Sequence, residues 1–119
     1  MTSIYHNPRC SKSRATLSLL GQHGVNPEVI LYLDHPPDVP ALREIIEKLG
    51  GTAHDIIRDT ERAYKDLGLS DDSPEAVLLE AIAEHPILLQ RPIVVSGDKA
   101  AVGRPPERVL SLITQEDSP

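Results

Sequence analysis

Apolar positions in the first third of the chain fall into short continuous runs separated by a stretch with helical spacing. Residues 4–5 end one apolar run, and residues 29–33 (VILYL) form a second run of strand length. Between them, residues 13–22 are good helix formers, with Leu17 and Leu20 three positions apart. A continuous apolar strand is typical of a sheet covered on both faces, so we expect residues 29–33 to be buried.

The middle of the chain has the periodicity of helices. Apolar residues from Leu42 to Leu49 recur at helical spacing between Asp38, a favourable N-cap, and Gly50. Residues 52–58 and 60–67 are expected to form short helices. The first opens with a pattern resembling a capping box, Thr52-Ala53-His54-Asp55.

A further helix is predicted from Ser73 to His85. Ser73-Pro74-Glu75 has the order of an N-cap, a first-turn proline and a first-turn acid. The buried stripe of this helix is expected to consist of Val77, Leu78, Ala81 and Ile82.

The last part of the chain predicts a hairpin followed by a helix. Residues 93–95 and 100–102 are short apolar runs joined by residues 96–99 (SGDK). Pro105 and Pro106 open a helix whose buried side is Val109, Leu110 and Ile113. The resulting order is βαβ, a helical insertion at about residues 37–86, and ββα. This predicts an α/β, thioredoxin-like fold with a four-stranded mixed sheet, in a single domain spanning residues 1–119.

The composition of the chain limits which partners it can bind and which compartment it suits. A net charge of −6 and a pI near 5.2 argue against binding to nucleic acid or to an anionic membrane. One cysteine excludes an internal disulfide, and the first residues lack the pattern of a signal peptide, so none is expected. The histidines have no metal-ligand spacing. We therefore expect a soluble, cytoplasmic monomer with no metal and no bound cofactor.

The most informative chemistry is at Cys10, where a strand should pass into a helix. Unpaired backbone N–H groups and the positive end of the helix dipole favour a thiolate there. His6, Arg9, Lys12 and Arg14 add cationic side chains nearby in the sequence. Most free cysteines are small buried hydrophobic residues, but these polar and cationic neighbours are unlike a core. Cys10 is therefore expected to be a nucleophile.

Three arginines occur at the end of a predicted helix or directly before a proline. Arg58 ends a short predicted helix, and Arg91 and Arg104 each precede a proline. Arginine offers a flat donor fork that suits tetrahedral oxyanions, so three converging on one thiol would form an anion pocket. A single arginine is more often a solvated surface residue, and spacing alone does not make them converge.

Five tracts of the sequence resemble the glutaredoxin-coupled arsenate reductases. They are residues 6–14 (HNPRCSKSR), 57–58 (IR), 64–69 (YKDLGL), 85–95 (HPILLQRPIVV) and 103–105 (GRP). The resemblance runs from Ile4 to about Ile113 and is closest to a compact, chromosomally encoded subgroup. It implies that Cys10 attacks arsenate while Arg58, Arg91 and Arg104 hold the oxyanion. It also implies that His6 promotes the thiolate, that Asn7, Ser13 and Arg14 support the loop, and that the peptide bond before Pro92 is cis.

The same resemblance implies the source of electrons. Glutathione would reduce the adduct through a mixed species, and glutaredoxin would resolve the remaining disulfide and release arsenite. Residue 13 is serine, so no dithiol can form three positions after Cys10. External thiols are therefore expected to be co-substrate and partner.

Two alternatives remain open. One is a glutathione-dependent thiol oxidoreductase or deglutathionylase, which would use Cys10 without needing three oxyanion arginines. The other is a transcription regulator of the Spx type, which has the same fold. Those regulators typically use a Cys-x-x-Cys switch, whereas residues 10–13 here are Cys-Ser-Lys-Ser. Arg9 beside the nucleophile also departs from the plasmid-type reductases, which have a small residue there.

Overall fold

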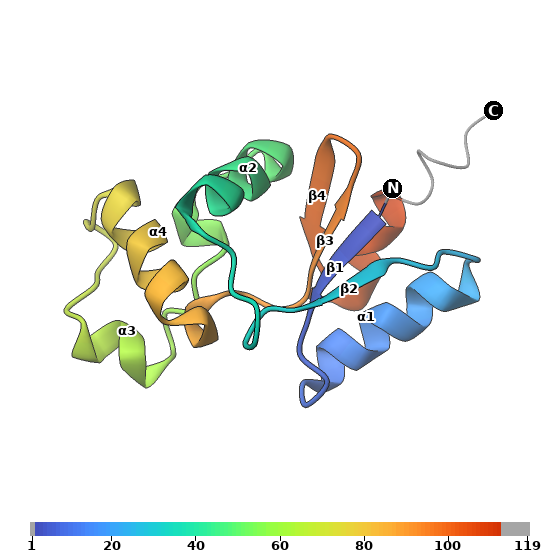
Figure 1. The fold of residues 1–119 in the computed structure, drawn as a ribbon, viewed down its shortest axis with the longest axis horizontal. Coiled ribbons are helices and arrows are strands. Elements are labelled where there is room, and N and C mark those ends of the chain that lie inside the picture. The colour runs from blue at the N-terminus through green and yellow to red at the C-terminus, as the bar shows by residue number, and fades with distance from the viewer. Residues whose placement is uncertain (1, 113–119) are drawn as a thin grey trace. The chain divides into compact units, whose positions relative to one another are not determined.

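The computed structural model describes residues 2–112, which contain a four-stranded mixed sheet (Figure 1). Its strands are β1 (Thr2–His6), β2 (Glu28–Leu31), β3 (Ile93–Ser96) and β4 (Lys99–Val102), in the order β2-β1-β3-β4. Strand β1 is parallel to β2 and antiparallel to β3, and β3 and β4 form an antiparallel hairpin. The predicted α/β class, the βαβ and ββ order and the thioredoxin-like sheet are confirmed.

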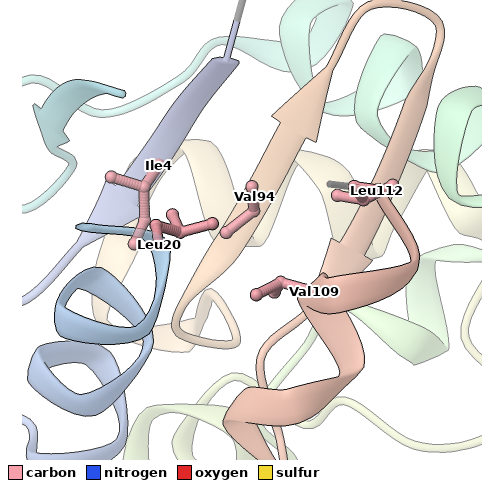
Figure 2. Close-up of a cluster of buried hydrophobic side chains, with 5 residues drawn as sticks. All are labelled: Ile4, Leu20, Val94, Val109 and Leu112. Atoms are coloured by element: carbon pink, nitrogen blue, oxygen red, sulfur yellow. The ribbon is translucent and has the colours of Figure 1, made fainter. Parts of the chain in front are cut away.

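The hydrophobic core of the sheet lies against helix α1 (Ser11–Gln22) and the 3₁₀ segment η3 (Pro106–Val109). Figure 2 shows a cluster of side chains from the sheet, from α1, from η3 and from the residues just after η3, all of them at most 5% exposed: Ile4, Leu20, Val94, Val109 and Leu112. All five of these side chains are aliphatic, and the sequence has neither Phe nor Trp. Ile113, expected on the buried side of the last helix, lies outside the described residues.

The chain divides into two compact units. The first contains the sheet and is built from the residues up to Tyr32 and from Arg91 onward. The second, Leu33–Gln90, is helical. It consists of α2 (Val39–Leu49), η1 (Ala53–Asp55), α3 (Arg62–Asp66), α4 (Glu75–Glu84) and η2 (Pro86–Leu88). Within it, α4 packs against α2, η1 and η2.

Local capping signals account for the boundaries in the second unit. Asp38 caps α2 by accepting the N–H of Ala41 at 2.9 Å, and Gly50 ends that helix with a φ of 71°. Thr52 donates its N–H to the Asp55 carboxylate at 2.7 Å, as the capping box predicts. The predicted short helices at residues 52–58 and 60–67 are shorter in the structure, at 53–55 and 62–66.

Two burial predictions are wrong. Strand β2 ends at Leu31 and lies at the edge of the sheet, where Val29 is 44% and Leu31 37% exposed. In α4, Val77 is 44% exposed, and the buried stripe is Leu78, Leu79, Ala81 and Ile82.

One predicted cap is also wrong. Ser73 does not cap α4, because its Oγ accepts the N–H of Ser70 at 2.9 Å and the helix begins at Glu75. No helix among residues 2–112 is long and apolar enough to cross a membrane.

Candidate active site

Cys10 is the N-cap of α1, which begins at Ser11 and not at residue 13 as the sequence predicts. Its carbonyl accepts the N–H of Arg14 at 3.0 Å, the first hydrogen bond of the helix. The thiol makes no capping hydrogen bond and is partly exposed, and the first turn has no acidic residue. The sulfur is therefore attached directly at the positive end of a 12-residue helix.

Asn7 fixes the loop that leads to the thiol. Its carbonyl accepts the N–H of Cys10 at 3.0 Å, and its Oδ1 accepts the N–H of Arg9 at 3.0 Å. Its own N–H is donated to the Oγ of Ser13, also at 3.0 Å. Three hydrogen bonds from one residue thus hold the backbone from residue 7 to residue 13.

His6 and Ser13 form a buried pair beneath this loop. The Nδ1 of His6 lies 2.6 Å from the Oγ of Ser13, with His6 6% exposed and Ser13 fully buried. Burial, and then the positive charge of Arg14, lower the pKa of His6 below its ordinary 6.5. The ring is therefore neutral at about pH 7. This corrects the expectation that His6 contributes a positive charge near the thiol.

The three remaining cations of this segment differ in their contacts. Arg14 donates from Nη1 to the carbonyl of Pro8 at 2.8 Å, so it braces the loop as expected of a supporting residue. The side chains of Arg9 and Lys12 are exposed and have no hydrogen bond or ion pair within residues 2–112. Positive charge at the loop thus comes from arginine and lysine.

Arg91 and Arg104 are brought together in the first unit. Arg104 donates from Nη1 to the carbonyl of Arg91 at 3.2 Å. The Nε of Arg91 is buried and has no acceptor in the described part of the chain. A buried N–H without an acceptor is uncommon in folded proteins, so this guanidinium is suited to a ligand that accepts hydrogen bonds.

The corner that bears these arginines packs closely against α1. Gly103 donates its N–H to the carbonyl of Pro92 at 2.9 Å, and a Cβ on Gly103 would lie 2.6 Å from the Oγ1 of Thr16. The peptide bond between Arg91 and Pro92 is cis, as expected, and so is that between Arg104 and Pro105. The cis bond at Pro105 and the contact with Thr16 were not predicted.

Arg58 belongs to the second unit. Its Nη1 lies 2.6 Å from the Oε1 of Glu61, and its backbone N–H is donated to the carbonyl of Leu88 at 2.7 Å. Glu61 was missed by the sequence reasoning, although its position three residues after Arg58 is a spacing at which side chains can meet. Residues 2–112 contain no cluster of three His, Cys, Asp or Glu side chains able to hold a metal.

Comparison with known proteins identifies the family. Residues 5–112 match the model of the ArsC family. The chain belongs to the ArsC family. The matched region contains Cys10 and all three predicted arginines, Arg58, Arg91 and Arg104.

Relatives of this ArsC family member cover nearly its whole length. An arsenate reductase of Neisseria meningitidis serogroup A is 51% identical over 112 residues, which are 92% of this chain and 96% of the relative. A protein of Escherichia coli K12 described as uncharacterized, YfgD, is also 51% identical over 92% of this chain and 94% of its own length. The structure of an arsenate reductase from Vibrio cholerae superposes with a TM-score of 0.90 at 45% identity, covering 93% and 96% of the two chains.

Proposed function

We propose that this ArsC family protein is an arsenate reductase in which Cys10 is the nucleophile. The observation that carries the proposal is the buried Nε of Arg91, which has no acceptor in the described part of the chain and lies in the unit that contains Arg104 and Cys10. A tetrahedral oxyanion would supply the missing acceptor. The names of the relatives support arsenate as that oxyanion.

In the first step, the Cys10 thiolate would form a bond to arsenic, and one arsenate oxygen would leave as water after taking up protons. Arg91 and Arg104 would stabilise the negative oxygens during this displacement, with Arg58 as a third donor. The helix N-terminus would stabilise the attacking sulfur. The His6–Ser13 pair and Asn7 would hold the loop in position.

In the second step, the thiol of glutathione would attack Cys10 sulfur as the sulfur–arsenic bond breaks. Arsenic gains two electrons and leaves as arsenite, while the two sulfurs form a disulfide. Glutaredoxin would then reduce that disulfide and regenerate Cys10. Because the chain has one cysteine, these external thiols are required, and a reducing compartment, the cytoplasm, is the proposed location.

The test is a coupled assay of NADPH consumption with arsenate, glutathione and glutaredoxin. Cys10→Ser should abolish turnover. Arg91→Ala and Arg104→Ala should each lower kcat/KM by about tenfold or more, since a charge-assisted hydrogen bond contributes roughly 1.5–3 kcal/mol. Lysine at either position should rescue poorly, because it lacks the two-pronged fork.

Arg108→Ala is the matched control, because it removes one exposed arginine from η3. Its turnover should equal that of the parent. A deglutathionylase would lose activity with Cys10→Ser and tolerate both arginine variants. Absence of arsenate-dependent NADPH consumption by the parent, with a competent glutaredoxin, would refute arsenate reduction.

A further inference from the structure

The ion pair between Arg58 and Glu61 is the shortest and most buried among the described residues. Its atoms are 2.6 Å apart, and the side chains are 18% and 25% exposed. The other three pairs are 3.1–3.7 Å long and each has a side chain at least 52% exposed. Shielding from water strengthens the attraction between opposite charges, so this pair differs physically from a surface ion pair.

The backbone on both sides of the pair is fixed. Ile57 forms an antiparallel bridge with Leu89, flanked by hydrogen bonds from Arg58 N–H to Leu88 O and from Gln90 N–H to Ile56 O. Glu61 donates its own N–H to the carbonyl of Arg58 at 3.2 Å. The two side chains therefore project from a turn whose backbone is held at both ends.

Glu61 is also the N-cap residue of α3, but its side chain does not cap that helix. An N-cap side chain ordinarily accepts an N–H of the first helical turn, and glutamate is not a preferred residue there. Here the carboxylate contacts Arg58 instead. The identity of residue 61 is thus explained by the arginine and not by the helix.

We propose that Glu61 sets the oxyanion affinity of Arg58. The proposal rests on the anion-binding role given to Arg58 in the proposed function. Glu61 anchors the guanidinium through Nη1, and the remaining guanidinium nitrogens have no partner among residues 2–112. Its negative charge also offsets the positive charge of the guanidinium, which keeps the affinity of Arg58 for oxyanions low. Glu61 is therefore a positioning and affinity-determining residue, not a catalytic one.

The charge is tested by titrating sulfate, a tetrahedral dianion that thiols do not reduce, into the purified full-length protein by calorimetry. Glu61→Gln keeps an oxygen that can accept from Nη1 but removes the charge. It should lower the Kd for sulfate by about two- to fivefold. Glu80→Gln removes the same charge from an exposed position of α4 and should leave the Kd unchanged.

The anchoring is tested by Glu61→Ala, which removes the acceptor as well as the charge. It should bind sulfate more weakly than Glu61→Gln does. In an Arg58→Ala background, Glu61→Gln should have no effect on the Kd, because the effect requires the guanidinium. An unchanged Kd in Glu61→Gln, or the same gain in the Arg58→Ala background, would overturn the proposal.

Failure of this proposal is distinguishable from failure of the proposed function. Sulfate binding requires neither glutathione nor glutaredoxin, whereas arsenate reduction is measured by NADPH consumption. In the coupled assay, Glu61→Gln should lower the KM for arsenate by the same factor as the Kd for sulfate. A KM that stays at the parent value despite tighter sulfate binding would contradict a role for Glu61 in substrate affinity.

Discussion

The ring of His6 is buried beside Ser13 in a position where its neutral form is stabilised. Its pKa is lowered in the folded protein, first by burial and then by the charge of Arg14. Protonation would place a cation in a poorly solvated site. Protonation of His6, which lies beside the loop that carries Cys10, therefore makes the stability of the fold depend on pH.

Because the unfolded chain takes up a proton on His6 at a higher pH than the folded protein, stability should decrease as the pH falls below about 6.5. The contribution is complete above that value and is lost as the pH falls through the lowered pKa. Its slope is limited to about 1.4 kcal/mol per pH unit, the effect of one proton. Guanidinium chloride unfolding between about pH 8 and pH 5.5 would measure it.

His6→Asn retains a polar group near the position of Nδ1 but does not titrate, so its unfolding free energy should change less over this range. His35→Asn, at an exposed turn, is the matched control and should keep the slope of the parent. Equal slopes in His6→Asn and the parent would contradict the assignment.

At the scale of elements, Gly103 is where the backbone after β4 comes close to helix α1. A Cβ there would lie 2.6 Å from Thr16 Oγ1 and 2.8 Å from Pro92 Cγ, so any larger residue would push the loop away from α1. Gly103→Ala should destabilise the protein by about 1–3 kcal/mol in urea unfolding. It should also weaken oxyanion binding, because Arg104 is the next residue.

Removing the Thr16 side chain tests the cause. The double variant Gly103→Ala, Thr16→Ala should lose less stability than the sum of the two single variants, because the closest clash is gone. Gly21→Ala is the matched control, since a Cβ there meets nothing within 4 Å and alanine favours a helix. Additive losses would show that crowding against Thr16 is not the reason for glycine.

The elements most accurately predicted from the sequence are those fixed by local chemistry. The Asp38 cap, the Gly50 stop and the Thr52–Asp55 box depend on residues close in the chain and were confirmed. The prediction that β2 is buried was wrong, because the burial of a strand depends on its place in the sheet, and long-range packing decides that place. Contacts such as Arg104 with Arg91 likewise join distant segments, so spacing gave no information about them.

At the scale of the whole molecule, the helical unit Leu33–Gln90 is inserted between the two segments of the sheet unit. We propose that both units form one domain that unfolds in a single transition. A unit of this size buries a smaller fraction of its surface on folding than a larger domain does, which favours mutual dependence. Leu20→Ala in the first unit and Leu78→Ala in the second should each lower the melting temperature of the same transition. Each should lower the free energy of unfolding by about 2–5 kcal/mol.

Calorimetry would show this as one peak that shifts in both variants, with equal calorimetric and van't Hoff enthalpies. Val77→Ala, at an exposed position beside Leu78, is the control and should shift the peak little. Two peaks, each moved by only one of the core variants, would show that the units are separate domains.

The single thiol at the start of α1 also determines how the protein withstands oxidants. A sulfenic acid on Cys10 has no second cysteine in this chain with which to condense. It is therefore either trapped by a small thiol from solution as a mixed disulfide, which is reversible, or oxidised further to sulfinic acid, which is not. Because this chain has a single cysteine, the concentration of small thiols in solution should determine how much of the protein survives exposure to peroxide.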